Sequence, residues 1–505
     1  MSVMTKMWYI ILGLLTLSPG LFGMEQEEPI VEFGSFPARE TVDEFTVMQD
    51  LQGGVYVLYI AGNQFSVIRG DRDGNFEPYT VPQLEPGFQN PRNLSVNPPG
   101  FTEYAAFMAD KMGILYVYLF RIDHDGDLLC AAILEAGQSG LHAGFSLGES
   151  YAESCNVYIT IEGVLSCFTG AGRHDRPPVR RALSLAGEKV DRYGVLRKPD
   201  TSEHYGWYSV FREADERNIT LFLIHENGLV IREAIGVYTE KTEITGHITT
   251  QGEVQYTIIR DKGVRLFKET GAGFVPVAAF FVPVPVDAYI SPGLSGFSFG
   301  IATGTEENKK QLYGIVNEDS DTPQITAWIE VTGTTAADFV SPDRKRCVGI
   351  FEKDGRLWSA SIRVESTAVK PDGLAPVEWG RYLFVNQSTG RLWVYLVDDK
   401  RAALLIHTYD GFHWEKTADI ALPEGIDPQT IRVEPGISDN PFLLYTNFIF
   451  LGAGNNCIAG DISGKTWNII PGRQRTWGRM INGYVFLAVH DEDLLTVYRM
   501  KGPEL

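Results

Sequence analysis

Short motifs recur along this chain of 505 residues at multiples of one spacing, and this repetition constrains the fold more than any other feature. Asp71-Arg-Asp-Gly-Asn75 is echoed by Asp123-His-Asp-Gly-Asp127, 52 residues later. Thr169-Gly-Ala-Gly172 returns as Thr270-Gly-Ala-Gly273 after 101 residues. Both offsets are multiples of about 51 residues, and a fixed period of this length is typical of a repeat protein.

Two further repeats agree with this unit. Gly144-Phe-Ser-Leu-Gly148 returns as Gly296-Phe-Ser-Phe-Gly300 after 152 residues, and the tryptophans Trp414 and Trp467 lie 53 residues apart. Gly355-Arg-Leu-Trp358 and Gly390-Arg-Leu-Trp393 lie only 35 residues apart, so the phase of the repeat slips in this region.

Each unit contains short runs of β-branched and aromatic residues that end at turn residues, and such runs predict strands. Pairs such as Asp73-Gly74 and Asp125-Gly126 tolerate the positive φ angles of two-residue hairpins. The clearest predicted strands are 55–60, 114–120, 219–224, 391–397 and 484–489.

Four short antiparallel strands with their connections fill a unit of about 51 residues, which is the size of a β-propeller blade. The sequence therefore predicts an all-β chain with a single propeller domain over residues 24–505. Division by the unit gives about nine blades, but propellers usually have 4–8, so eight blades are favoured and seven come next. The terminal strands, near residues 29–33 and 494–498, should share one blade.

Two segments resemble the Asp-box, or BNR, repeats of β-propeller proteins. Tyr409-Asp-Gly-Phe-His-Trp414 matches the box in Asp410, Gly411 and Trp414, with a spacing one residue short, and Ile462-Ser-Gly-Lys-Thr-Trp467 keeps the end of the pattern. The resemblance covers about 60 residues. It implies a propeller, and because the box is structural in that family, it implies no active site.

The N-terminus has the pattern of a secretory signal peptide. Lys6 precedes an apolar run from Trp8 to Leu17, and Ser18-Pro19-Gly20 then ends it. We expect residues 1–23 to be the signal, with cleavage between residues 20 and 24, and the mature protein to be exported to a periplasm or the cell surface. No later segment has the eighteen uninterrupted apolar residues of a membrane span, so none is expected after signal removal.

The formal net charge of −20 disfavours partners with phosphate backbones, because binding them depends on Lys and Arg. Nucleic acid is therefore not expected as a partner. The basic stretch Arg173–Arg181 is either a contact loop for an acidic partner or a solvated loop.

Two turns imitate the first half of a calcium loop, since oxygen-bearing side chains stand at alternate positions. The candidate metal ligands are Asp71, Asp73 and Asn75 in one turn and Asp123, Asp125 and Asp127 in the other. The closing Glu of such a loop is missing from both, so a solvated Asp-Gly turn is the favoured interpretation and Ca²⁺ is the one cofactor to consider.

Five cysteines are too few for a disulfide scaffold. Cys155 and Cys167 flank a predicted hairpin, where they either form a cross-strand disulfide or pack as buried free thiols.

Two apparent catalytic motifs are interpreted as structural. The Gly-x-Ser-x-Gly matches centred on Ser146 and Ser298 lack the following helix that a nucleophile elbow needs. Phe120-Arg121-Ile122 is similar to the Phe-Arg-Ile-Pro of sialidases, but Asp123 replaces the proline. No catalytic residue is assigned.

Three functions stay open, and the oligomeric state stays unassigned. The leading hypothesis is an exported, non-enzymatic platform that binds a protein or glycan partner in the cell envelope, with contacts on the loops. The alternatives are a carbohydrate-cleaving propeller enzyme, similar to a sialidase or lyase, and a calcium-stabilised adhesin.

Overall fold

The computed structural model of the chain shows an all-β protein. It describes residues 30–37, 42–50, 54–96, 104–148, 155–173, 177–197, 203–212, 216–225, 228–239, 242–248, 254–260, 263–270, 272–281, 289–292, 298–303, 310–316, 325–332, 334–340, 346–353, 356–363, 374–379, 381–388, 391–409, 414–433, 448–454, 456–461, 467–471, 474–477, 484–491 and 494–501.

These residues form ten antiparallel sheets of four strands each. The first five sheets along the chain are β2 (Val42–Gln49), β3 (Val55–Ala61), β4 (Gln64–Gly70) and β5 (Phe76–Pro78); β6 (Gln89–Val96), β7 (Tyr104–Lys111), β8 (Ile114–Ile122) and β9 (Leu128–Gln138); β10 (Ala143–Leu147), β11 (Cys155–Ile161), β12 (Val164–Ala171) and β13 (Val179–Ala182); β14 (Val190–Arg197), β15 (His204–Phe211), β16 (Glu216–Ile224) and β17 (Val230–Thr239); and β18 (Glu243–Ile248), β19 (Val254–Arg260), β20 (Gly263–Glu269) and β21 (Phe274–Phe281).

The remaining sheets are β22 (Tyr289–Pro292), β23 (Ser298–Thr303), β24 (Lys310–Val316) and β25 (Ile325–Thr332); β26 (Thr334–Val340), β27 (Arg346–Lys353), β28 (Arg356–Arg363) and β29 (Leu374–Trp379); β30 (Arg381–Ser388), β31 (Arg391–Asp398), β32 (Ala403–Tyr409) and β33 (Trp414–Ala421); β34 (Ile431–Val433), β35 (Phe448–Ala453), β36 (Asn456–Asp461) and β37 (Trp467–Pro471); and β38 (Gln474–Trp477), β39 (Tyr484–Asp491), β40 (Leu494–Lys501) and β1 (Ile30–Pro37). A short 3₁₀ helix, Pro428–Thr430, precedes β34.

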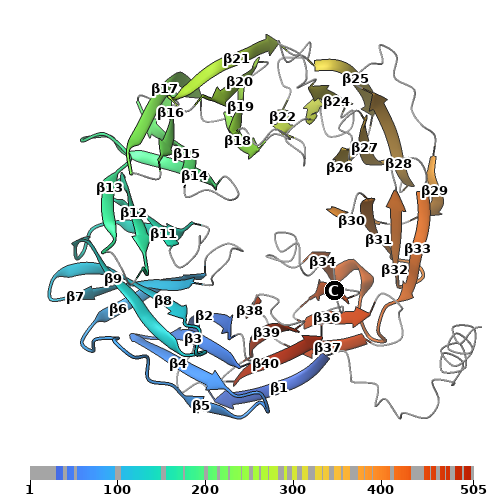
Figure 1. Cartoon of the computed structure of the whole chain (residues 1–505). Coiled ribbons are helices and arrows are strands. Elements are labelled where there is room, and N and C mark those ends of the chain that lie inside the picture. Colours follow the sequence, from blue (N-terminus) through green and yellow to red (C-terminus); the bar gives the residue numbers. More distant parts are fainter. Residues whose placement is uncertain are drawn as a thin grey trace, which may run out of the picture.

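The predicted strand class and the four-stranded unit are confirmed. Each of the five clearest predicted strands lies within an observed strand, and the predicted pairing of the chain ends is present, because β1 pairs with β40 from Ile30↔Met500 to Pro37↔Leu494. In Figure 1 the sheets stand around a common centre, and in sheets such as β2–β5 and β14–β17 the first strand is innermost and the fourth lies at the rim. The ten sheets of the described residues outnumber the eight blades that were favoured.

The core lies between neighbouring sheets. On β7, the side chains of Ala105, Phe107 and Ala109 pack against the β2–β5 sheet, whereas Tyr104, Ala106 and Met108 pack against the β10–β13 sheet. All six are fully buried. A strand with apolar residues at every position buries both of its faces, because successive side chains point to opposite sides. This explains the continuous apolar runs in the sequence.

The connectivity separates two faces of the assembly. In a meander of four strands, the turn between the second and third strands lies at the same end as the connection to the next sheet. We call this end the hairpin face and the opposite end, with the first-to-second and third-to-fourth connections, the loop face. Backbone bonds tie the hairpin face together, as Ser139 N donates to Gly113 O (2.9 Å) and Val190 N to Gly163 O (2.7 Å).

Two-residue hairpins on the hairpin face include Gly62-Asn63, Met112-Gly113 and Glu162-Gly163, and both residues of the last two pairs have positive φ. The predicted pairs Asp73-Gly74 and Asp125-Gly126 do not form such hairpins. Asp73-Gly74 belongs instead to a longer loop-face turn, in which Gly74 N donates to Asp71 O and Asp71 N to Asn75 O. Only the glycine of that pair has a positive φ, of 82°, which fits a type I turn followed by a glycine bulge.

Candidate functional site

The first calcium candidate is a loop-face turn whose acidic side chain bonds to its own backbone. Asp71 Oδ1 accepts hydrogen bonds from the amides of Asp73 and Asn75, both at 2.9 Å, and Oδ2 accepts from Asn75 Nδ2 at 2.9 Å. The hydrogen bond from the Asn75 side chain is the main cause that holds the pKa of Asp71 below its ordinary value. Asp71 therefore closes the turn between β4 and β5 as an Asx cap.

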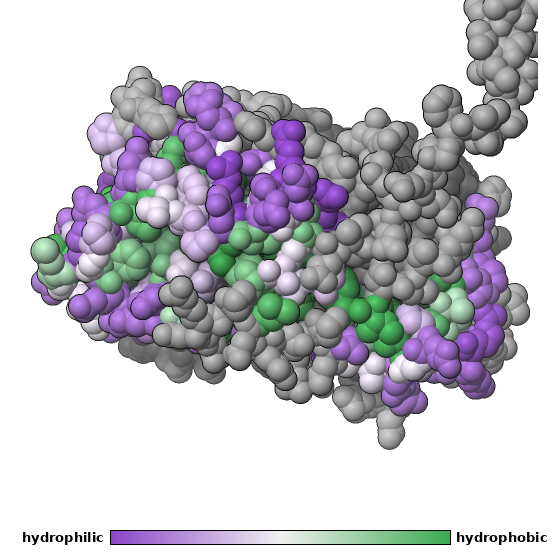
Figure 2. Space-filling view, turned by 90° about the horizontal axis from the view of Figure 1, so that it is seen from below, coloured by the Kyte–Doolittle hydropathy of each residue, from purple (hydrophilic) through white to green (hydrophobic). Residues whose placement is uncertain are grey.

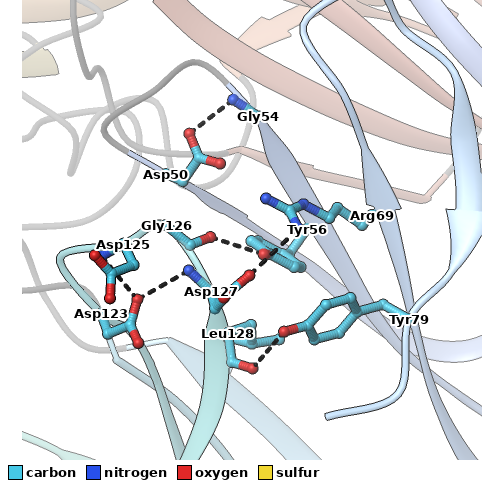
Figure 3. A network of polar contacts seen from close by, with 10 residues as sticks. All are labelled: Asp50, Gly54, Tyr56, Arg69, Tyr79, Asp123, Asp125, Gly126, Asp127 and Leu128. Carbon is cyan, nitrogen blue, oxygen red and sulfur yellow. Dashed lines mark hydrogen bonds and ion pairs between the residues drawn. The ribbon is translucent and has the colours of Figure 1, made fainter. Parts of the chain in front are cut away.

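The second candidate turn has the same geometry and also contacts the neighbouring sheet. Asp123 Oδ1 accepts from the amides of Asp125 (3.0 Å) and Asp127 (2.9 Å). Tyr56 of β3 donates its hydroxyl to Gly126 O at 2.7 Å, and Tyr79 donates to Leu128 O at 3.1 Å (Figure 3). The turn between β8 and β9 is thus fixed against the β2–β5 sheet.

An arginine completes this contact between the two sheets. Arg69 of β4 donates to Asp127 Oδ1 at 3.3 Å, and its guanidinium lies 5.4 Å from the ring centre of Tyr56 and 5.9 Å from that of Tyr79 (Figure 3). Burial raises the pKa of the Tyr56 hydroxyl well above its ordinary value, so it stays protonated and donates. The cluster joins two sheets. In both turns, some of the carboxylate oxygens that a calcium ion would need already accept hydrogen bonds.

The calcium proposal therefore finds no preformed centre at these turns. Within the part of the chain that the structure describes, no group of three or more His, Cys, Asp and Glu side chains could hold a metal ion. Asp71 and Asp123 accept backbone amides, Asp127 accepts Arg69, and Asp125 lies beside His124 Nε2 at 3.5 Å. A calcium ion at either turn stays a prediction.

Cys155 and Cys167 lie in the predicted hairpin, which β11 and β12 form. Both are free, fully buried thiols, and burial raises the pKa of each well above its ordinary value. In the register of the two strands Cys155 lies opposite Ala171, and Cys167 lies opposite Tyr158. The two are therefore not direct cross-strand partners, and a disulfide between them stays a prediction.

The two serine motifs lie within strands. Ser146 is in β10, and its hydroxyl lies 2.8 Å from the Tyr193 hydroxyl of β14, so it joins the inner strands of adjacent sheets. Ser298 begins β23, the second strand of its sheet. Neither serine stands on a strand-to-helix turn, and their different strand positions show that the 152-residue repeat was a coincidence.

The basic stretch and the sialidase-like segment also serve packing. Arg180 Nη1 donates to Ala136 O of the preceding sheet at 2.8 Å, and Arg181 Nε donates to Thr169 Oγ1 at 3.3 Å. Residues 174–176 lie outside the described residues. Arg121, at the end of β8, is 5% exposed. The Asp-box-like residues 410–413 and 462–466 also lie outside the description, between the third and fourth strands of their sheets.

Sequence reasoning missed a set of exposed apolar side chains on the hairpin face. Met112 is 94% exposed and has a φ of 51°, in the left-handed region that disfavours its side chain. Val164, Leu185 and Phe211, in the next hairpin, connection and strand end, are 36%, 55% and 53% exposed. Met112-Gly113 was visible as a turn pair, but the exposure of the methionine could not be read from the sequence.

Contacts on the hairpin face link the successive segments that carry these side chains. Ser139 N bonds to Gly113 O, and His142 N and O bond to Glu162, which connects the Met112 hairpin to the Val164 hairpin. A Cβ on Gly163 would lie 3.0 Å from Lys189 Cα, and Tyr208 donates to Glu188 at 3.1 Å. We call the residues Met112, Val164, Leu185 and Phe211 the apolar arc.

No family model matches this chain, and no curated protein matches it significantly. None of the helical segments among the described residues has the length and apolar character to cross a membrane.

Proposed function

We propose that the chain is a propeller of ten blades that presents its hairpin face to a protein partner, as a non-enzymatic platform. The observation that carries this proposal is Met112. The side chain of Met112 is almost fully exposed and gains no burial on folding, while its backbone φ is unfavourable and costs free energy. Such a residue is expected where exposure serves binding.

The composition of the apolar arc favours a protein over a glycan. Three of its four side chains are aliphatic, and methionine and aromatic residues are enriched in protein interfaces. The arc crosses successive turns of one face, which is where binding residues concentrate on a rigid scaffold.

The ten sheets support ten blades, and the pairing of β1 with β40 supports a ring closed by the two ends of the chain. Closure would bury the sheet faces at the chain ends as it does elsewhere. Particle images averaged along the ring axis by electron microscopy should show ten radial units; eight units or an open arc would refute this part.

The platform is tested with a photo-crosslinking residue placed at position 112, 211 or 125 of the full chain. Positions 112 and 211 lie in the apolar arc, whereas Asp125 is an exposed residue of the loop face. One common adduct from 112 and 211, absent from 125, is expected in the source envelope. Equal labelling from all three positions, or none from the arc, would refute the proposal.

Met112→Asn provides the matched variant. Asparagine tolerates the left-handed backbone better than methionine, so the hairpin and the melting temperature should be kept while the apolar side chain is removed. Added in excess, the unlabelled parent chain should reduce formation of the adduct by competing for the partner. The Met112→Asn chain should not reduce it.

Export to a periplasm or the cell surface is part of the proposal, and residues 1–23 lie outside the described residues. N-terminal sequencing of the protein from an envelope fraction should begin between residues 21 and 25. An intact Met1 in the cytoplasm would contradict export. For the calcium-stabilised adhesin, chelation should lower the melting temperature, and an unchanged melt would remove that alternative.

A further inference from the structure

Three equivalent hairpins differ in how the outer edge of their third strand is covered. Ala61↔Gln64, Lys111↔Ile114 and Ile161↔Val164 close the hairpins, so these pairs exchange both backbone hydrogen bonds. The next residues, Phe65, Leu115 and Leu165, therefore direct their N–H and C=O groups away from the hairpin, toward the fourth strand. They lie 50 residues apart along the chain.

Two of the three edges are covered. Leu115 is paired with Gly137 of the long strand β9. Leu165 has no strand partner, but its N–H donates to Ser184 Oγ at 2.9 Å and its C=O accepts from Leu183 N at 2.9 Å. Both arrangements satisfy the outward backbone groups.

Phe65 has neither kind of cover among the described residues. Strand β5 has 3 residues and pairs only with Ile68, Arg69 and Gly70, after which Tyr79 N donates to Val67 O at 2.8 Å. Pro78 lies opposite Ile68, whose backbone groups face β3, so the N–H that proline lacks would have pointed away from β4. The edge of β4 from Gln64 to Ser66 is left open.

A groove of about 790 Å³ runs along this open edge. Aromatic side chains from three elements line it, namely Phe36 of β1, Tyr59 of β3 and Phe76 of β5. The rim of the molecule seen in Figure 2 carries hydrophobic patches between hydrophilic ones. Apolar walls beside unpaired backbone groups are the features that receive an added strand.

We propose that this groove binds an extended peptide segment of a partner protein, which adds to β4 as an antiparallel or parallel strand through the N–H and C=O of Phe65. The edge from Gln64 to Ser66 has room for about three residues of such a strand. The groove opens on the rim, so the proposal does not depend on the hairpin face as a platform.

The lining defines the peptide. Alternate side chains of an added strand point to the same side, so an apolar residue at every second position would fill the aromatic walls. Glu77 is the only charged residue among the described lining residues and is exposed. A basic residue next to the apolar pattern would therefore be favoured, and an acidic residue there would be disfavoured.

The test is selection of peptides from a phage-displayed library of random dodecapeptides on the full chain. Peptides with alternating apolar residues and a lysine or arginine are expected, and binding should slow exchange of the Phe65 amide by about ten-fold or more. Gln64→Trp, which fills the groove, should weaken binding by about ten-fold or more. Gln138→Trp, an exposed glutamine of the covered β9 edge, should not.

Backbone pairing is tested by N-methylation of the selected peptide on alternate residues. Methylation of the amides that face β4 should abolish binding, and methylation of the other set should leave it. No selected peptide, insensitivity to Gln64→Trp, or equal effects of both methylated sets would overturn the proposal. So would a Phe65 amide that is already protected in the free chain, since that would mean that this chain or a second copy fills the groove.

Discussion

The β2–β5 and β6–β9 sheets start from the same plan and end with different rims. Each has a two-residue hairpin and an Asx-capped turn, yet β5 has 3 residues and β9 has 11. The residues after the two turns also differ: the last backbone bond from the chain beyond β5 to β4 is that of Tyr79 N to Val67 O, whereas β9 pairs along the whole of β8. The turn motif thus sets where the fourth strand starts, and the residues beyond it set how much of the third strand it covers.

The inner strands of the two sheets vary much less, because both of their faces are buried by neighbouring sheets. Tyr56 and Leu58 of β3 and Phe107 of β7 meet in one core cluster with no exposed surface. Variation is tolerated at the rim, where strand edges meet solvent, and functional differences are expected there.

The largest expected effect comes from breaking the core that the two sheets share. Phe107 is fully buried, and its ring centre lies 4.4 Å from that of Phe65 and 5.1 Å from that of Tyr118. Phe107→Ala should lower the free energy of unfolding by about 3–5 kcal/mol. Thermal melts would measure this, with Met112→Ala on the exposed hairpin as a control that should change little. If Phe107→Ala and Met112→Ala had the same melting temperature, the two sheets would not pack as described.

A smaller effect is expected from opening the covered edge of the β10–β13 sheet. Ser184 is 3% exposed, and Ser184→Ala removes the acceptor of the Leu165 amide. An unpaired buried donor costs about 1–3 kcal/mol. Exchange of the Leu165 amide should also become faster. If its exchange stays slow, another group covers this edge and the comparison with Phe65 fails.

The Tyr56 hydroxyl, which bonds across the two sheets, should contribute less to the free energy of unfolding. Tyr56→Phe removes the hydrogen bond to Gly126 O but keeps the buried ring, so a loss of about 0.5–1.5 kcal/mol is expected. Tyr59→Phe, on the same strand but half-buried, is the control in the melting experiment. A Tyr56→Phe protein as stable as the parent would mean that the Asp123–Asp127 turn is not held by this bond.

The smallest effect concerns the Asx cap and depends on pH. The pKa of Asp71 is lowered on folding, so its contribution is present above its unfolded value near 3.8 and is lost as pH falls through the lower folded value. Asp71→Ala should therefore melt below the parent at neutral pH and together with it in strong acid. Carboxyl NMR should give Asp71 a midpoint below 3.8. A midpoint above this value would contradict the cap.

The strands and their four-stranded grouping could be predicted because turn residues and apolar runs are local signals. Asp71 and Asp123 do occupy equivalent turns, and Thr169 and Thr270 both lie at the end of the third strand of their sheets, β12 and β20. The serine repeat does not, since Ser146 is on a first strand and Ser298 on a second. Connections of unequal length between sheets blur the period, and the usual range of blade numbers then favoured eight.

The candidate site could not be predicted for a different reason. The roles of Asp127 and Arg69 depend on a contact between sheets whose residues lie 58 positions apart, and no local pattern indicates this contact. The open edge at Phe65 is likewise an absence of pairing, which appears only when β5 is seen to stop at Pro78.

Amide hydrogen exchange of the free protein at Phe65, Leu115 and Leu165 tests the central claim most directly. These residues occupy the same position in three successive hairpins and differ in the cover of their outward N–H groups. The amide of Phe65 should exchange much faster than those of Leu115 and Leu165, which should both be protected. Equal protection of all three would show that the edge of β4 is closed and would contradict this account of the rim.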